Sequence, residues 1–359
     1  MKEFAIAGRK IGPNNACFIV AEMSGNHNQD FGKAVKIVEA AADARCNAIK
    51  LQTYTPDTLT LNSNKPWFME RGEGNPEGWK GKSLYELYQS AYTPWDWHPK
   101  LQKIAHDLGL VFFSTPFDDT AVDFLENLNV PCYKIAAYEA TDMLLLRKVA
   151  STGKPVIMSV GFSTKEEVKF GVETLRKYGA KDIALLHCLT TYSDNPDPSN
   201  AHLRTMLDLR DNFDVVCGFS DNNSGVEVPL LAAMAGASII EKHLILDKSD
   251  TGPDSQFSLD PKELKEIVKA IRRAEKVMGE VYYGPRSESE KENLRFRRSL
   301  FVVKDMRKGE KFTGENVKSI RPADGLETKF YDEVIGKIAK DDIEKGTPLS
   351  WSLIEGENI

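Results

Sequence analysis

This chain has no long hydrophobic run and is poor in cysteine and histidine. Its longest apolar segments fall well short of the ~20 residues that a membrane-spanning helix needs. The opening residues, MKEFAIAGRK, lack a basic stretch followed by an apolar run, which is the pattern of a secretion signal. We therefore expect no membrane as a partner and a location in the cytoplasm.

The few cysteines show no metal-binding or redox spacing. There is no C-x-x-C pair, and most of the cysteines lie inside apolar runs: Cys17, Cys46, Cys132, Cys188 and Cys217. Buried free thiols in a reducing compartment are the expected state.

Several common functional signatures are also missing. A glycine-rich phosphate loop, an H-E-x-x-H zinc motif and a G-x-S-x-G nucleophile elbow do not occur. The 47 basic residues are outnumbered by 53 acidic ones, giving a net charge of −6, so nucleic acid is not an expected partner. An anionic small molecule would need a local basic pocket.

What the sequence does contain is a long alternation of strand and helix patterns. At 359 residues, with 41% hydrophobic and 28% charged residues, it has the composition of a globular protein and exceeds one typical core. Segments with helical periodicity separate short apolar runs at 17–22, 48–54, 110–115, 132–139, 155–161, 183–190, 215–221 and 238–244. Eight such βα units predict a closed (β/α)8 (TIM) barrel rather than an open sheet.

Helix signals support this reading. Residues 31–45 and 165–178 have amphipathic patterns, and a capping box of Thr164 and Glu167 opens the second segment. The last helix of the repeat is expected to begin at Asp260, followed by proline.

The alternation of strand and helix patterns is interrupted at two places. An unusually long connection, 55–93, follows the second strand, and such loops in compact domains are commonly functional. Beyond the barrel pattern, short strand and turn signals replace the βα period. We expect a barrel domain at 1–280, a charged linker at 281–295 and a small, mostly β domain at 296–359.

Polar side chains occur where the predicted strands end. The active site of a (β/α)8 barrel lies at these ends, where the βα loops begin. Lys50 and Lys134 lie in otherwise apolar strands, where an unpaired buried ammonium is strongly disfavoured. Two lysines facing one pocket predict an anionic ligand. The structural alternative is that either lysine leans out at the rim or pairs with a carboxylate such as Glu22 or Glu139.

Hydroxyl groups accompany the lysines at the strand ends. Small donors suited to phosphate or carboxylate oxygens are provided by Ser114, Thr115, Ser159 and Ser220. A single hydroxyl at such a position is often only a turn or cap residue.

Of the six histidines, one is a candidate metal ligand. His243 ends the eighth strand, in the run Glu241-Lys242-His243, although a lone strand histidine is often simply hydrogen-bonded in place. Surface positions on helices or loops are expected for His98, His106 and His202.

These residues lie in segments that resemble the sialic acid synthase family, most closely its pseudaminic acid branch. The matching segments span nearly the whole chain: FIVAEMSGNHN, AIKLQTYTPDTLTLNS, STPFD, YKIAAYEA, GFSD, IIEKH, FSLD and SIRPADGL. The stretch QTYTPDTLTLNS is similar to the pseudaminic rather than the neuraminic branch. The tail resembles the antifreeze-like (SAF) domain of that family, so the resemblance implies a TIM barrel followed by a SAF domain.

The resemblance also implies a reaction. Members of the family are transferases that condense phosphoenolpyruvate with an open-chain acylamino-sugar aldehyde and release phosphate. In the pseudaminic branch the sugar is 2,4-diacetamido-2,4,6-trideoxy-altrose, and the product is the nine-carbon 2-keto acid pseudaminic acid. A divalent metal, Mn2+ or Mg2+, and a domain-crossed homodimer are implied as well, with Arg321 reaching the barrel of a partner subunit.

The functional residues of the family map onto this chain by motif. Glu22 is implied as the acid/base, and Lys50, Lys134 and Tyr192 as catalytic. The residues implied to bind phosphoenolpyruvate are Lys50, Thr115, Lys134, Ser159, Thr190 and Ser220. Those implied to bind the sugar are Gln52, Glu139, Tyr192, Asp254 and Arg321. The metal would be held by His243 and Asn222.

Three positions depart from the family pattern. Asn222 stands where the family has a metal-binding histidine, Ala137 replaces a serine, and Ser193 replaces a proline. Because an amide oxygen is a weaker ligand than an imidazole nitrogen, we expect a weakly bound metal. Three alternatives stay open: a legionaminic or N-acetylneuraminic acid synthase, a Schiff-base aldolase that uses Lys50 or Lys134, and a non-catalytic sugar-binding homologue.

Overall fold

The chain forms two compact units, Met1–Gly279 and Glu280–Ile359. The structure, a computed structural model, describes residues 2–71, 79 and 81–356. Within these residues, no helix is both long enough and apolar enough to cross a membrane.

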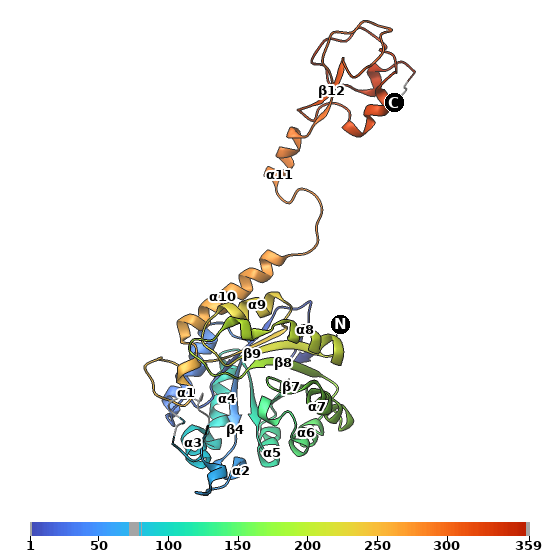
Figure 1. The fold of residues 1–359 in the computed structure, drawn as a ribbon. Coiled ribbons are helices and arrows are strands. Elements are labelled where there is room, and N and C mark those ends of the chain that lie inside the picture. Colours follow the sequence, from blue (N-terminus) through green and yellow to red (C-terminus); the bar gives the residue numbers. More distant parts are fainter. Residues whose placement is uncertain (1, 72–78, 80, 357–359) are drawn as a thin grey trace. The chain divides into compact units, whose positions relative to one another are not determined.

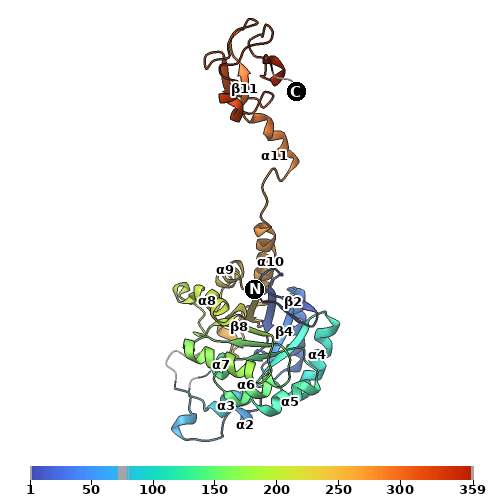
Figure 2. The ribbon, with the colours of Figure 1, turned by 90° about the vertical axis from the view of Figure 1, so that its right-hand side faces the viewer.

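The first unit is a closed barrel of eight parallel strands with helices on the outside (Figures 1 and 2). Its strands are β3 (Phe18–Glu22), β4 (Ala48–Thr53), β5 (Val111–Pro116), β6 (Tyr133–Ile135), β7 (Val156–Ser159), β8 (Ile183–Leu189), β9 (Val216–Asp221) and β10 (Ile239–His243). Pairing of β10 with β3 closes the barrel and sets His243 opposite Glu22. The predicted (β/α)8 fold is confirmed.

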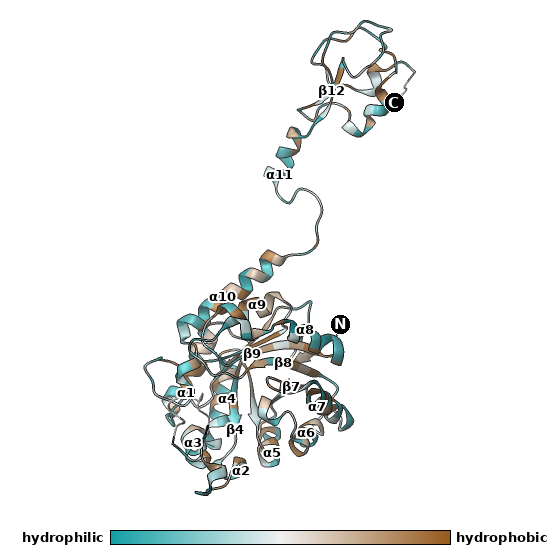
Figure 3. Cartoon of the chain, viewed as in Figure 1, coloured by the Kyte–Doolittle hydropathy of each residue, from teal (hydrophilic) through white to brown (hydrophobic). Residues whose placement is uncertain are grey.

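Helices, most of them amphipathic, cover the barrel. They are α1 (Phe31–Asp43), α4 (His98–Asp107), α5 (Asp119–Asn127), α6 (Met143–Ala150), α7 (Lys165–Lys177), α8 (Arg204–Phe213), α9 (Glu227–Met234) and α10 (Pro261–Met278). The capping box of Thr164 and Glu167 opens α7 as predicted, and Asp260 caps α10 by accepting from the Glu263 amide at 2.8 Å. Figure 3 shows hydrophobic strands behind outer helices, such as α7, that are largely hydrophilic.

A hairpin that the sequence analysis does not predict closes the amino-terminal end of the barrel. Strands β1 (Phe4–Ile6) and β2 (Arg9–Ile11) pair antiparallel. Their side chains Phe4, Ile6 and Ile11 pack in one buried cluster with residues from inside the barrel, including Phe18 and Phe113. This end is therefore filled with apolar groups, which leaves polar chemistry to the opposite end.

Short elements occupy the loops at the carboxyl ends of the strands. The long connection after β4 holds α2 (Pro56–Leu59), the 3-10 helix Pro66–Phe68, α3 (Leu84–Ala91) and the 3-10 turn Trp95–Trp97. The part of the predicted loop at 72–78 and 80 lies outside the described residues. Further 3-10 turns are Ala137–Glu139, Pro198–Ala201 and Ser255–Phe257. The predicted strand 132–139 is thus too long, because the chain leaves the barrel after Ile135.

The second unit has its own small core. Its elements are α11 (Glu288–Asn293), β11 (Ser299–Val302), β12 (Val317–Ile320) and α12 (Tyr331–Val334), with 3-10 turns at Leu294–Phe296, Thr328–Phe330 and Trp351–Leu353. β11 and β12 pair antiparallel, and an isolated bridge joins Met306 to Ile343. The segment predicted as a linker, 281–295, contains the short helix α11 rather than only loop.

All five cysteines are buried and free, as predicted. They lie in or beside barrel strands, where burial raises the pKa of the thiols, for example that of Cys188 to about 11. Such thiols are poor nucleophiles at neutral pH.

Candidate active site

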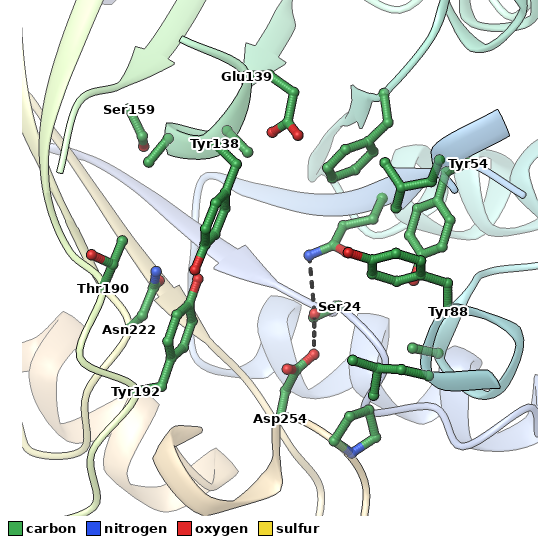
Figure 4. Close-up of a pocket in the computed structure, with 18 of the residues that line it drawn as sticks. Ser24, Tyr54, Tyr88, Tyr138, Glu139, Ser159, Thr190, Tyr192, Asn222 and Asp254 are labelled. Carbon is green, nitrogen blue, oxygen red and sulfur yellow. Dashed lines mark hydrogen bonds between the residues drawn. The ribbon is translucent and has the colours of Figure 1, made fainter. Parts of the chain in front are cut away.

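One cavity of about 440 Å³ opens at the carboxyl ends of the strands (Figure 4). It is lined by most of the residues singled out from the sequence: Lys50, Gln52, Lys134, Glu139, Ser159, Thr190, Tyr192, Ser220, Asn222, His243 and Asp254. Glu22 and Thr115 lie behind the lining, each in contact with Lys50. Arg321 is an exposed residue of the second unit.

The floor of the cavity is a buried network of two lysines and two glutamates. Lys50 Nζ forms an ion pair with Glu22 and lies 3.8 Å from Glu241 Oε2. Lys134 Nζ lies 3.4 Å from Glu241 Oε1, and these side chains are at most 5% exposed. The alternative in which a lysine pairs with Glu22 therefore holds for Lys50, and both lysines also face the cavity.

The pKa values follow from burial and from these pairs. Burial alone would lower the pKa of Lys50, but Glu22 and Glu241 outweigh it and raise that pKa. Burial lowers the pKa of Lys134, despite the attraction of Glu241. Burial raises the pKa of Glu22, whereas Lys134 and Lys50 overcome burial and lower the pKa of Glu241. With all four groups ionised, two positive and two negative charges cancel.

Hydroxyl groups hold the ends of the floor side chains. Lys50 Nζ donates to Thr115 Oγ1 at 3.1 Å, and Lys134 Nζ donates to Ser159 Oγ at 2.8 Å. Ser220 Oγ donates to Glu241 Oε1 at 3.0 Å. Three hydroxyls assigned to phosphoenolpyruvate by the resemblance thus orient the charged groups of the floor.

A second chain of hydrogen bonds runs up one wall of the cavity (Figure 4). Gln52 Nε2 donates to Glu22 Oε1 at 3.2 Å and to Ser24 Oγ at 3.0 Å. The Ser24 hydroxyl donates in turn to Asp254, whose carboxylate also accepts from the Gly25 amide at 3.2 Å. Burial raises the pKa of Asp254, and the bond from Ser24 opposes that shift. Gln52 therefore links Glu22 on the floor, by way of Ser24, to the loop that carries Asp254.

Aromatic side chains make up much of the cavity wall. The ring of Tyr54 lies 5.8 Å from that of Tyr88 and 5.3 Å from that of Phe117, both edge-on. Tyr192 packs on Phe257 at 5.0 Å, and Figure 4 shows the hydroxyls of Tyr192 and Tyr138 pointing toward each other. This wall offers apolar contact to a ligand whose charged end lies on the floor.

Glu139 is a partly buried acid beside this aromatic wall. Its Oε2 is buried and has no hydrogen-bond partner within the described part of the chain. Burial raises its pKa from 4.5 to about 7, so at neutral pH a large fraction of it carries a proton. A protonated carboxyl at this place can both donate to and accept from polar groups of a ligand.

Family models match both units of this chain. Residues 37–283 match the model of the NeuB family, and residues 297–355 match the SAF domain. The chain belongs to the NeuB family. The first match covers more than half of the sequence and includes three of the four floor residues, Lys50, Lys134 and Glu241.

Individual relatives agree with the NeuB assignment. The chain is 42% identical to the pseudaminic acid synthase of Helicobacter pylori over 94% of this chain and 97% of that protein. It is 36% identical to the N,N'-diacetyllegionaminic acid synthase of Campylobacter jejuni over 89% of this chain and 95% of that one. A crystal structure of the N-acetylneuraminic acid synthetase of Leptospira borgpetersenii superposes with a TM-score of 0.70 at 31% identity, covering 82% and 96% of the two chains.

The metal ion implied by resemblance to the NeuB family finds two donors. The buried His243 Nδ1 has no hydrogen-bond partner in the described structure, and burial lowers its pKa to about 3, so the imidazole is neutral. Asn222 lines the same cavity and donates its amide to Cys188 Sγ at 3.6 Å. No group of three or more histidine, cysteine or acidic side chains suited to a metal occurs in residues 2–71, 79 and 81–356. The donor set fits an ion that takes its other ligands from water or substrate.

Glu241 and Ser24 are not among the residues predicted to have a role, yet both are central to this NeuB-type site. Strand alternation offered a signal for Glu241, because it is two residues from His243 and therefore on the same face. Ser24 follows the end of β3, and only the folded loop shows that it joins Gln52 to Asp254.

One histidine assignment is wrong. His98, expected on the surface, is fully buried. Its Nε2 is 2.9 Å from Thr53 Oγ1, which is in turn 2.6 Å from Ser114 Oγ. Ser114 thus belongs to a buried cluster behind the strands. His106 and His202 are exposed, as expected.

Proposed function

We propose that this protein is a transferase that condenses phosphoenolpyruvate with an acylamino-sugar aldehyde. The product is a nine-carbon 2-keto sugar acid, and phosphate is released. The pseudaminic acid precursor 2,4-diacetamido-2,4,6-trideoxy-altrose is the proposed sugar, supported by 42% identity to pseudaminic acid synthases over most of the chain.

The observation that carries the proposal is the pair of buried ammonium groups on the cavity floor. Lys50 and Lys134 are 3% and 2% exposed and both line the cavity. Glu22 and Glu241 already pair with these buried lysines, and both ammonium groups also face the cavity, where a carboxylate or phosphate ligand would meet two positive charges. Ser159, Thr190 and Ser220 lie in the same lining with hydroxyls suited to the oxygens of phosphoenolpyruvate.

The charge of the floor bears on how phosphoenolpyruvate binds. Because Glu22 and Glu241 cancel the two lysines, the floor alone offers no net positive charge to a ligand that carries several negative ones. A divalent cation at His243 and Asn222 would supply the missing charge and polarise the aldehyde oxygen of the sugar. These two neutral donors would bind the ion weakly, as expected for an ion that binds together with the substrate.

The proposed reaction forms one carbon–carbon bond and breaks the bond between C2 and the phosphate oxygen. The methylene carbon of phosphoenolpyruvate attacks the aldehyde carbon, a C–C bond forms, and the aldehyde oxygen takes a proton to become a hydroxyl. Water adds to the cation left at C2 of phosphoenolpyruvate and loses a proton. The C2–O bond to phosphate then breaks while the new C2 hydroxyl gives its proton to the departing phosphate, leaving a 2-keto acid and free phosphate. Lys50 and Lys134 would hold the anionic groups throughout.

Glu22 is the proposed acid/base. Burial raises its pKa, which makes the ionised carboxylate a better proton acceptor and lets it act as the acid once it has taken a proton. It lies behind the cavity lining in contact with Lys50, so a proton would pass between Glu22 and the substrate by way of the Lys50 ammonium, while Gln52 orients the carboxylate. Thr115 would act by orienting Lys50.

The sugar is proposed to lie against the aromatic wall. Gln52, Glu139, Tyr192 and Asp254 would bind its hydroxyl and acylamino groups, and each lines the cavity. Arg321 is proposed to come from the second unit of a partner subunit in a domain-crossed homodimer. This assigns 1–280 to catalysis, 281–295 to the connection and 296–359 to sugar binding, in a protein that we place in the cytoplasm.

The test is phosphate release from phosphoenolpyruvate with a panel of acylamino sugars. Release with the altrose derivative, and little with N-acetylmannosamine or the legionaminic acid precursor, is expected. Equal or better turnover of the legionaminic precursor would move the protein to that branch. Phosphate release with none of the sugars would leave a sugar-binding homologue.

A further inference from the structure

A fully buried lysine stands outside the site described so far. Lys242 lies in β10 between Glu241 and His243, which both line the cavity, so its side chain is on the opposite, outer face of the strand. The side chain is 0% exposed, and its Nζ lies 3.1 Å from Asp221 Oδ2. The same ammonium donates to the carbonyl of Asn223.

These contacts fix the loop that follows β9. Asp221 is the last residue of β9, and its Oδ1 accepts from the Asn223 amide at 3.1 Å. Asn223 is therefore held at both its amide and its carbonyl, and it is 2% exposed. Asn222 lies between the two anchored residues and lines the cavity.

The side chain of Asn223 extends the same network to the loop that follows β8. Its Oδ1 accepts from Thr191 Oγ1 at 2.6 Å and from the Ser193 amide at 3.0 Å. A backbone bond from Ser224 to the Ser193 carbonyl, 2.9 Å long, joins the loops a second time. Tyr192, the residue between Thr191 and Ser193, also lines the cavity.

The same arrangement thus occurs twice. In each loop the residues before and after are held by a buried polar side chain, and the middle residue lines the cavity. Figure 4 shows Asn222 and Tyr192 on the same side of the cavity. Tyr192 has a φ of +50°, a left-handed conformation that a bulky residue rarely adopts and that persists only when its surroundings impose it. The residues on both sides of Tyr192 each donate a hydrogen bond to the buried Asn223 Oδ1, and these two bonds impose that conformation.

We propose that Asn223 is a positioning residue for the sugar side of the site, anchored by Lys242 and Asp221, that sets the conformation of Tyr192 and Asn222. The effect on catalysis rests on the proposed function, in which these two residues face the sugar and its metal. The effect on loop order does not.

The main test is the variant Asn223→Ala, which removes the acceptor oxygen but keeps the backbone contacts. Hydrogen exchange in the ligand-free full chain should show faster exchange of the Ser193 amide. In steady-state assays with phosphoenolpyruvate and the altrose derivative, kcat/KM for the sugar should fall by roughly 10- to 100-fold. The apparent KM for phosphoenolpyruvate should change less than about threefold, because the floor residues are untouched.

A matched control exists at the other end of the barrel. Asn47 Oδ1 accepts from the Ile19 amide and from Arg272 Nη2, both at 2.8 Å, so Asn47→Ala also deprives two donors of one asparagine oxygen. It should lower thermal stability while leaving sugar kinetics and Ser193 exchange as in wild type. Asn223→Asp, which keeps an acceptor oxygen, should restore the protection of the Ser193 amide.

A milder variant covers the case in which Asn223→Ala does not fold. Thr191 is exposed, so Thr191→Val removes one of the two loop contacts without a fold-wide cost. The hydrogen-exchange rate of the backbone amides at 190–194 should rise, and kcat/KM for the sugar should fall by about 3- to 10-fold. Wild-type exchange and wild-type sugar kinetics in the foldable variants would overturn the proposal. If the variants show faster hydrogen exchange but the wild-type protein has no synthase activity, the proposed function is refuted and the effect on loop order stands.

Discussion

Neutralising Glu241 should tighten phosphoenolpyruvate binding while it slows turnover. In the wild-type floor, Lys50 and Lys134 are balanced by Glu22 and Glu241. Glu241→Gln keeps the size of the side chain and its bond from Ser220, but it leaves the floor with one net positive charge.

The size of the effect can be worked from the geometry. Glu241 Oε1 lies 3.4 Å from Lys134 Nζ, and an anion held by that ammonium would lie a further hydrogen-bond length of about 2.8 Å away. Two unit charges about 6 Å apart repel by about 3 kcal/mol at an effective dielectric constant near 20. Removing Glu241 also lowers the pKa of Lys134 further, which offsets part of the gain. A net gain of about 1–2 kcal/mol corresponds to binding roughly 5- to 30-fold tighter.

The assay is calorimetric titration of the ligand-free protein with phosphoenolpyruvate, at one pH and one metal concentration. Lys134→Met is the matched variant of opposite sign, because it leaves one net negative charge. It should weaken binding by about tenfold or more, since a hydrogen bond to a charged group is also lost. Weaker binding in both variants would refute the charge argument and show that Glu241 acts by holding the lysines in place.

Other consequences can be checked independently. Because burial raises the pKa of Glu139 to about 7, the stability that its protonated form contributes is fully present below pH ~4.5 and is lost as the pH rises through about 7. Chemical unfolding at several pH values should therefore show wild type losing up to about 3 kcal/mol relative to Glu139→Gln across this range, and parallel curves would contradict it. Asn222→His should bind Mn2+ at least about tenfold more tightly in chelator-treated protein, because an imidazole replaces a weak amide ligand; identical titrations would remove Asn222 from the metal site. Mixing Arg321→Ala with Glu22→Ala chains should restore activity at one site per hybrid dimer if the tail crosses to the partner, and no recovery would show that each tail serves its own barrel.

The barrel could be predicted because its strands are buried on both faces. A strand of this kind is a nearly continuous apolar run, and the observed strands begin and end within one or two residues of most predicted ones. The exception is the run at 132–139, where the loop residues Ala136 and Ala137 are themselves small and apolar. Composition alone does not show that the strand stops at Ile135.

Elements that depend on tertiary contacts could not be predicted from the sequence. The strands of the hairpin, Phe4–Ile6 and Arg9–Ile11, have three residues each, too few for a periodic signal. His98 looked exposed because it opens a helix beside proline and charged residues. It is buried because Thr53 and the Pro94 carbonyl satisfy its ring nitrogens.

The candidate site was partly predictable for the same physical reason. Lys50 and Lys134 stood out because an ammonium in an apolar strand needs an explanation. The role of Glu241 depends on which charges it meets, and the anchoring by Lys242 depends on two loops that are distant in sequence. Neither can be read from the order of residues along one strand.

The central claim is the condensation itself, and an isotope experiment tests it most directly. The protein would be incubated with the altrose derivative and phosphoenolpyruvate carrying ¹⁸O in the oxygen that bridges carbon and phosphorus, and both products would be analysed by mass spectrometry. The account predicts a nine-carbon 2-keto acid and phosphate that retains the ¹⁸O, because the C2–O bond breaks. Unlabelled phosphate, or a product formed from pyruvate and trapped on a lysine by borohydride, would contradict it.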